Sequence, residues 1–285
     1  MFKQISSLFK LRIGIIMMFT ALAAMVVTPG EQPAGFEVLV LAIAVLVSAA
    51  GAGAFNQYFE VDLDSRMQRT RHRPFVTGRF HKSLLWLLFI FLLMLAGVAS
   101  AAVVINDAAA LYIFLGAFFY AVVYTVWLKR RTWMNIVIGG ASGSFAVLAG
   151  AAAVDPAMSP VPILLALVLF FWTPSHFWSL AIAKHQEYAD AGVPMLPVVI
   201  GDQRTAVVVM VNTLVLVGLS ILPFFYGMGW IYLAGAVSGG AYFIYCNYLM
   251  IREPSATVAM KSFFASLLQL VLLLLGAVAD VYLLA

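Results

Sequence analysis

The sequence has 285 residues, of which 64% are hydrophobic and only 10% are charged, and its mean hydropathy is +1.04. Its 16 lysines and arginines exceed its 12 aspartates and glutamates, which gives a formal net charge of +4. This composition excludes an ordinary soluble domain, whose surface would need more charged side chains. It predicts instead one membrane domain over residues 1–285, because helices in lipid satisfy their own backbone polar groups.

Nine apolar runs approach the roughly 20 residues that span a bilayer. In chain order they cover residues 11–27, 36–55, 84–105, 108–128, 133–154, 161–183, 206–226, 228–250 and 262–285. They predict an all-α, polytopic bundle of nine transmembrane helices. The first run follows two basic residues and contains Ala21-Leu22-Ala23, so a cleavable signal peptide is the alternative there. Its removal would leave the remaining topology unchanged.

The basic residues predict how these helices are oriented. With the N-terminus in the cytoplasm and the helices alternating, all 16 lysines and arginines, from Lys3 onward, fall on the cytoplasmic side. The positive-inside rule asks only for an excess there, so the charges support both the count of nine and a C-terminus outside. The outward connections are short and the inward ones are longer and charged, which places any chemistry at the cytoplasmic face. Cys246 is the single cysteine, so no intramolecular disulfide is possible.

The largest inward connection spans residues 56–82 and opens with a row of oxygen ligands. Asn56, Glu60 and Asp64 are spaced i, i+4 and i+8, which on a regular helix keeps their side chains within roughly 80° of one another. One amide and two carboxylates suit Mg²⁺, which commonly keeps further positions for water and substrate phosphates. Asp62 would point away from this row if the helix stays regular.

A dense group of basic residues follows the acids: Arg66, Arg69, Arg71, Arg73, Arg79 and Lys82. Carboxylates beside many cations are what a metal-bound diphosphate would require. The alternative is that the basic residues only set the topology and the acids balance them.

The second inward connection, residues 184–204, brings a further acid. Lys184 and Glu187 stand at i and i+3, followed by Tyr188, and His176 lies two turns earlier on roughly the same helical face. Glu187 could complete a metal site begun by the first row. Alternatively, Glu187 belongs to an ordinary solvated helix end, and His176 only bonds to a neighbouring helix.

Three blocks carry a resemblance over almost the whole chain. They are residues 56–73, which end in RTRHR directly before Pro74, residues 124–140, YTVWLKRRTWMNIVIGG, and residues 171–198, FWTPSHFWSLAIAKHQEYADAGVPMLPV. Together they resemble the haem-farnesylating branch of the UbiA-type membrane prenyltransferase superfamily.

The resemblance implies roles for particular residues. It implies that magnesium diphosphate binds at the catalytic positions Asn56, Glu60, Asp64 and Glu187, and that cations at Arg69, Arg73, Lys129 and Lys184 bind the diphosphate. It makes His176 the first choice for a haem contact. This branch usually carries an acid at the position of Asp62, which disagrees with the helical geometry argued above.

The sequence departs from the branch at three places. Glu60 stands where aspartate is usual, Gln186 and Glu187 stand where two acids are common, and residues 144–147 replace a common Pro-Pro pair. The first change keeps a carboxylate that can bind Mg²⁺. The second puts the detailed second half of the metal site in doubt, and the third could alter the acceptor pocket.

The reaction implied is transfer of a farnesyl group from farnesyl diphosphate to a vinyl group of haem B, followed by addition of water to give haem O for haem-copper terminal oxidases. The resemblance implies a Mg²⁺-dependent enzyme in the cytoplasmic (inner) membrane of a bacterium, with no mitochondrial presequence and no nucleic-acid partner. It leaves open whether haem O passes directly to a haem A synthase or a terminal oxidase.

Two other functions compete with this one. A quinone or chlorophyll precursor could accept the prenyl group by the same chemistry, although the HFW and PMLPV segments argue against it. A transporter would also show nine helices and cytoplasmic charge, but no pair of Gly- or Pro-broken helices recurs in matching halves.

Overall fold

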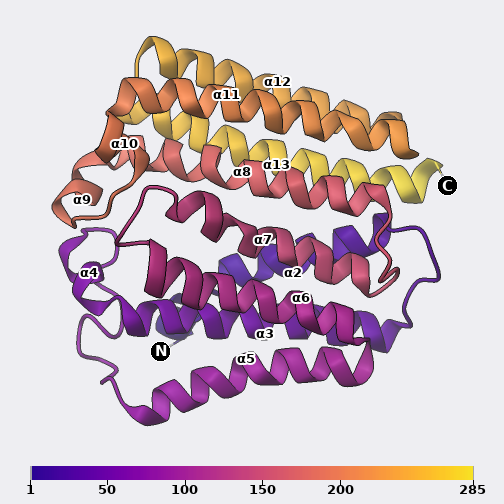
Figure 1. Ribbon diagram of the computed structural model, residues 1–285, viewed down its shortest axis with the longest axis horizontal. Helices are drawn as coiled ribbons and strands as arrows, with labels where there is room; N and C mark the ends of the chain where they lie inside the picture. The colour runs from indigo at the N-terminus through magenta and orange to yellow at the C-terminus, as the bar shows by residue number, and fades with distance from the viewer. Residues whose placement is uncertain (1, 285) are drawn as a thin grey trace.

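Helices form all the regular structure that the computed structural model describes, which covers residues 2–284 (Figure 1). In chain order they are α1 (Phe2–Leu8), α2 (Leu11–Val27), α3 (Gly35–Phe59), α4 (Val61–Arg66), α5 (Leu84–Val104), α6 (Asp107–Phe118), the π-helix η1 (Phe119–Leu128), α7 (Asn135–Ala152), α8 (Pro160–Ala183), α9 (His185–Asp190), α10 (Leu196–Ile200), α11 (Asp202–Ile221), the 3-10 helix η2 (Leu222–Tyr226), α12 (Trp230–Arg252) and α13 (Ala256–Leu284). The side chains of Phe2, Lys3 and Leu284 lie outside the described set. The predicted all-α class is confirmed.

Each of the nine predicted runs coincides with a long helix or with a continuous pair of helices. The bounds of α2 match the prediction, α6 runs directly into η1, and α11 runs directly into η2. Within residues 2–284, seven of these segments are long and apolar enough to cross a membrane. The other two are α2, which has 17 residues, and α12, which carries several glycines and tyrosines. The count of nine crossings therefore stays a prediction.

The long helices pack in two groups. Helices α2, α3, α5, α6 and α7 form one group, helices α8, α11, α12 and α13 form the other, and α7 packs against α8 where the groups meet (Figure 1). The outer faces remain apolar, as on α5, where Leu84, Leu85 and Phe91 are exposed. Such faces suit contact with lipid tails.

Glycines allow the backbones of neighbouring helices to approach closely. A Cβ placed on Gly150 of α7 would lie 1.9 Å from the carbonyl oxygen of Ala21 in α2, and one on Gly235 of α12 would lie 2.5 Å from the carbonyl oxygen of Leu272 in α13. Both distances are shorter than real Cβ contacts, so no side chain fits at either crossing. Small residues at helix contacts are a common device of membrane proteins.

Buried polar side chains link the helices of the second group. Ser175 of α8 and Asn247 of α12 both hydrogen-bond to Thr213 of α11, at 2.9 and 2.8 Å. Ser262 of α13 donates to Asn247 at 2.5 Å and also contacts Ser179 of α8 at 2.9 Å. Hydrogen bonds of this kind join membrane helices where water is absent.

The two charged inward connections lie at the same end of the bundle. Figure 1 shows α4, α9 and α10 gathered there, with the N-terminus towards that end and the C-terminus at the other. Leu63 and Met67 of the first connection join one hydrophobic cluster with Tyr188 and Met195 of the second. Packing thus brings together two segments that are about a hundred residues apart in the sequence.

Candidate active site

The first acidic row lies where a long helix is interrupted. Glu60 ends α3 and begins α4, with φ −94° and ψ 21°, so the regular helix expected through residues 56–64 is wrong. The hydrogen bonds on either side persist, from Glu60 N to Asn56 O at 3.0 Å and from Asp64 N to Glu60 O at 2.8 Å. The interruption therefore changes the direction of α4, while the side chains of Asn56, Glu60 and Asp64 all stay near the C-terminal end of α3.

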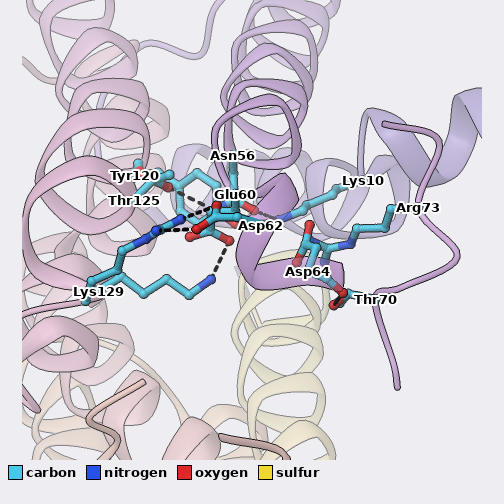
Figure 2. A network of polar contacts seen from close by, with 11 residues as sticks. Lys10, Asn56, Glu60, Asp62, Asp64, Thr70, Arg73, Tyr120, Thr125 and Lys129 are labelled. Carbon is cyan, nitrogen blue, oxygen red and sulfur yellow. Dashed lines mark hydrogen bonds and ion pairs between the residues drawn. The ribbon is translucent and has the colours of Figure 1, made fainter. Parts of the chain in front are cut away.

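Each of the three expected ligands is held by one cation (Figure 2). Lys10 Nζ donates to Asn56 Oδ1 at 2.7 Å, Lys129 Nζ pairs with Glu60 Oε2 at 2.5 Å, and Arg73 pairs with Asp64 Oδ2 at 2.6 Å. Asn56, Glu60 and Asp64 are at most 2% exposed. The structure thus confines oxygen ligands and basic side chains to one buried polar cluster.

The π-helix η1 places its polar residues opposite α3. Asn56 Nδ2 donates to Thr125 Oγ1 at 3.0 Å, and both this pair and the pair of Glu60 with Lys129 are separated by 69 residues in sequence. A π-helix is rare and often marks a functional position. Here it keeps Thr125 and Lys129 in register with the two ligands that they contact.

Two tyrosines of η1 form the apolar wall of this cluster. The rings of Tyr120 and Tyr124 stack with centroids 5.5 Å apart. Lys10 Nζ lies 5.3 Å from the centre of the Tyr120 ring, and Lys129 Nζ lies 5.4 Å from that of Tyr124. Contact with a ring face stabilises a cation that is partly removed from water.

Asp62 lies outside this buried cluster. Both of its carboxylate oxygens accept hydrogen bonds from Arg130 at 2.7 Å, and its side chain is 55% exposed. The bond from Arg130 lowers the pKa of Asp62 from 3.8 to about 2. Asp62 therefore ties α4 to the segment after η1 and does not turn toward Glu60.

The second region repeats the helix interruption. Lys184 ends α8 and begins α9, with φ −122° and ψ 29°. Its ammonium lies 3.2 Å from Glu187 Oε1, so the expected i, i+3 pair forms despite the interruption. Gln186, where the resemblance expects an acid, donates to Asp190 at 2.7 Å and is exposed.

His176 lies apart from these groups. It stacks between Trp172 and Phe263, with both ring centroids 4.2 Å away, and its Nδ1 lies 2.7 Å from Ser266 Oγ. It thus faces α13, whereas Lys184 and Glu187 lie beyond the interruption of α8 and do not continue its helical face.

The described residues do not gather the acids into one metal site. Within residues 2–284, no three His, Cys, Asp or Glu side chains are arranged to hold a metal ion. Arg69 is exposed and makes no hydrogen bond or ion pair in that part of the chain. The expected ligands Asn56, Glu60 and Asp64 adjoin one another, and Glu187 belongs to the neighbouring segment.

Two carboxylate oxygens nevertheless fit a divalent cation. Glu60 Oε1 and Glu187 Oε2 are both buried and have no hydrogen-bond partner. A buried carboxylate oxygen without a partner is costly, and a hard cation such as Mg²⁺ is a suitable partner for it. One such oxygen belongs to each acidic region.

Sequence reasoning missed three residues of the cluster. The charge pattern gives Lys10 a role in topology only, and Tyr120 and Thr125 lie in a run whose hydropathy predicts an ordinary membrane helix. Tyr120 OH accepts a hydrogen bond from Lys10 at 2.8 Å, and burial lowers the pKa of Lys10 well below its usual value. A lysine directly before an apolar run was the one available signal, and the positive-inside rule already accounted for it.

Comparison with known proteins identifies relatives along nearly the whole chain. The model of the UbiA prenyltransferase family matches residues 17–271. Protoheme IX farnesyltransferase 2 of Paramagnetospirillum magneticum is 54% identical over 278 residues, which cover 98% of this chain and 96% of that protein. Protoheme IX farnesyltransferase 1 of the same organism is 45% identical over 281 residues, 98% of each chain.

Solved structures of low sequence identity share the fold. A digeranylgeranylglyceryl phosphate synthase matches with a TM-score of 0.82 at 19% identity, over 98% of both chains. A UbiA homolog from Archaeoglobus fulgidus bound to DMAPP and Mg²⁺ matches with a TM-score of 0.72 at 14% identity, over 95% of this chain and 99% of that one.

Proposed function

The chain belongs to the UbiA prenyltransferase family, and from that premise we propose that it transfers a farnesyl group from farnesyl diphosphate to a vinyl group of haem B, with addition of water, to give haem O. The substrates follow from the relatives that carry the name protoheme IX farnesyltransferase, since identity to them extends over 98% of the chain. The observation that carries the chemistry is the buried cluster in which three oxygen ligands each contact one cation.

The site supports a division of roles between acids and bases. Asn56, Glu60 and Asp64, with Glu187 from the second region, would hold Mg²⁺ through their side-chain oxygens. The unpartnered oxygens of Glu60 and Glu187 support this assignment. The Archaeoglobus fulgidus homolog of the same fold was solved with Mg²⁺ and a prenyl diphosphate.

Basic residues bind the diphosphate and favour its departure. Arg73 and Lys129 lie inside the buried cluster, and Arg69 and Lys184 belong to the two charged connections at the same end of the bundle. Their charges stabilise the negative charge that develops on the leaving diphosphate as the carbon–oxygen bond breaks. When bound, Mg²⁺ would add positive charge at the same oxygens.

The acceptor does not require a protein nucleophile. As the diphosphate leaves, the allylic carbon becomes electron-poor and the vinyl group of haem B forms the new carbon–carbon bond. Water then adds to the resulting side-chain cation and loses a proton, which gives the hydroxyethylfarnesyl group. The chain's contribution is to position both substrates and to limit the access of other water to the allylic centre.

His176 is the proposed contact for the porphyrin. It is 6% exposed and lies in α8, one of the helices long and apolar enough to cross a membrane, among aromatic rings that suit an apolar macrocycle. Both substrates have apolar bodies, whereas the diphosphate is charged, so the proposed site opens at the cytoplasmic face of a bacterial inner membrane. A direct transfer of haem O to a haem A synthase or a terminal oxidase belongs to the same proposal.

The decisive experiment offers purified protein farnesyl diphosphate and haem B, with and without Mg²⁺, and looks for haem O by mass spectrometry. Haem O should form only with the divalent cation, while haem binding, followed by its absorption spectrum, should survive a chelator. If the protein prenylates an aromatic quinone precursor and not haem B, the proposed acceptor is wrong. Turnover that persists unchanged in strong chelator would contradict the mechanism.

A further inference from the structure

Ser266 of α13 holds two side chains of α8 at once. Its backbone carbonyl accepts a hydrogen bond from Trp172 Nε1 at 2.8 Å, and its hydroxyl oxygen lies 2.7 Å from His176 Nδ1. Ser266 is fully buried and His176 is 6% exposed. Because hydrogen bonds in such surroundings meet little competition from water, the two rings keep a defined position relative to α13.

The hydroxyl of Ser266 determines which nitrogen of His176 carries the hydrogen. Its oxygen lies 2.6 Å from the carbonyl oxygen of Phe263, so its own hydrogen points to that carbonyl, because two oxygens so close would otherwise repel each other. The hydroxyl oxygen can then only accept a hydrogen bond from His176, and Nδ1 is the donor. A second proton would leave an unpaired charge in this buried place, so the ring is neutral and Nε2 keeps a free lone pair.

Aromatic rings fix the direction of that lone pair. The rings of Trp172 and Phe263 stack on His176 at interplanar angles of 16° and 28°, so both faces of the imidazole are covered and only its edge is free. Within the described residues, Nε2 makes no hydrogen bond, and it is not among the fully enclosed polar atoms that lack a partner. An incoming group can therefore reach His176 at this edge, along the direction of the lone pair.

A neutral imidazole with one fixed N–H and one free lone pair is the form in which histidine binds a metal. Metal-bound histidines almost always donate their other N–H to a nearby acceptor, which fixes the orientation of the ring and raises the basicity of the ligand. We propose that Ser266 is a positioning residue for the acceptor substrate: it holds His176 so that Nε2 binds the iron of haem B. The inference rests on the proposed function and adds to it the atom that binds the porphyrin and the residue that orients this atom.

The test follows haem B on the purified protein by absorption and electron paramagnetic resonance spectroscopy, which report the axial ligand of the iron. Ser266→Ala removes the acceptor that orients His176. Haem B should then bind about 10- to 100-fold more weakly, the usual loss when the partner of a metal-bound histidine is removed, and the nitrogen-ligated signal should decrease. Ser266→Thr keeps a hydroxyl and should preserve most of the affinity and of the signal. Binding of farnesyl diphosphate with Mg²⁺ should be unchanged in both variants.

Ser262→Ala is the matched control. Ser262 is also a fully buried serine of α13, one turn earlier, but its hydroxyl donates to Asn247 and contacts Ser179. This variant should bind haem B with unchanged affinity and spectrum. His176→Ala should lose the nitrogen-ligated signal, and adding Ser266→Ala to it should weaken haem binding no further, because the serine acts through the histidine.

Three results would overturn the inference. Unchanged haem affinity and spectrum in Ser266→Ala would show that the serine does not orient the ligand, and equal losses in Ser262→Ala would assign both serines to helix packing. A spectrum that His176→Ala leaves unchanged would show that the iron is not bound there, even where haem O still forms and the proposed function stands. If the unmodified protein neither binds haem B nor forms haem O, the proposed function falls and this inference falls with it, so the two failures are distinguishable.

Discussion

At the scale of single residues, the site holds its charge in pairs that exclude water. The carboxylates of Glu60 and Asp64 are 0% and 3% exposed beside Lys129 and Arg73. Removing one member of such a pair leaves a buried charge without a partner, which typically costs about 3–5 kcal/mol. The whole free energy of unfolding of a marginally stable domain is only about 5 kcal/mol. Each carboxylate therefore needs a cation at all times, whether from the chain or from a metal.

Asp64 and Asp62 should differ in importance although both are aspartates of α4. Asp64→Asn should reduce haem O formation at least ~100-fold, equivalent to about 2.7 kcal/mol of transition-state stabilisation. Asp62→Asn should cost much less, because Asp62 pairs with Arg130 at the surface and exposed pairs contribute only about 0–1 kcal/mol. Steady-state rates of the two variants, at matched expression, check the order. Equal losses would mean that Asp62 turns inward as a ligand during the reaction.

The pair of Asp62 with Arg130 also predicts a dependence on pH. The pKa of Asp62 is lowered from 3.8 to about 2 by Arg130, so the carboxylate stabilises the folded protein at every pH above 3.8 and loses this effect as the pH falls through 2. Asp62→Asn should therefore lower the melting temperature slightly and equally at pH 5 and pH 8. A difference that grows between those pH values would contradict the assignment.

Arg69 provides a test of an exposed cation that has no partner in the described residues. Arg69→Ala should raise the KM for farnesyl diphosphate more than the KM for haem B, since a guanidinium can bind phosphate oxygens through two parallel hydrogen bonds. Lysine at this position should restore activity only partly. Unchanged kcat and KM for the diphosphate would show that Arg69 does not bind the diphosphate and only helps to set the membrane topology.

At the scale of elements, both charged regions begin where a long helix is interrupted. Glu60 separates α3 from the six-residue α4, and Lys184 separates α8 from the six-residue α9. Neither position carries glycine or proline, so the usual sequence signals of a helix end are missing. Contacts between distant segments accompany the interruption: Arg130 pairs with Asp62 of α4, and Leu63 and Tyr188 belong to one hydrophobic cluster that spans both regions.

The contrast between local patterns and contacts of distant segments explains which features could be predicted from the sequence. The nine long helical segments follow from hydropathy, which is a local property, and α2 was located to the residue. The row of Asn56, Glu60 and Asp64 was also found, because its spacing survives a mild interruption. The π-helix and the entry of Lys10 depend on contacts between distant segments, and no local pattern marks them. The same reason separates His176 from Glu187, which helical spacing alone had placed on one face.

The contact between α2 and α7 makes a sharp prediction about stability. Gly150→Ala would place a Cβ 1.9 Å from the carbonyl oxygen of Ala21, so the helices must separate and the folded protein should be destabilised by at least ~1–3 kcal/mol. Gly218→Ala is the control: nothing lies within 4 Å of its added Cβ, and the exchange should be neutral or stabilise α11 by up to ~1 kcal/mol. Thermal unfolding in detergent measures both. Equal stability of the two variants would show that the α2–α7 contact is looser than the structure has it.

At the scale of the whole molecule, the fold gathers the charged residues of the site at one end of the helix bundle. The buried cluster lies at the end that carries α4 and α9, and the apolar helices extend from it (Figure 1). A lipid-soluble substrate can thus keep its apolar body within the membrane while its diphosphate reaches the charged end. The two groups of helices contribute one acidic region each, so the site depends on the contacts that join them, of α7 with α8 and of α2 with α13.

Nine crossings with a cytoplasmic site can be tested by labelling single cysteines in a Cys246→Ser background. His81→Cys and Glu253→Cys replace exposed residues of two inward connections, whereas Asp107→Cys and Tyr282→Cys replace exposed residues near the opposite end. In intact cells, a membrane-impermeant maleimide should label only Asp107→Cys and Tyr282→Cys, because the other two positions face the cytoplasm. All four should react after the membrane is opened, which controls for accessibility. Tyr282→Cys is the decisive position: if it is protected in intact cells while Asp107→Cys is labelled, one of the six helical segments after Asp107 does not cross. The weakly apolar α12 would be the first candidate, since α13 would then cross alone and carry Tyr282 to the cytoplasmic side.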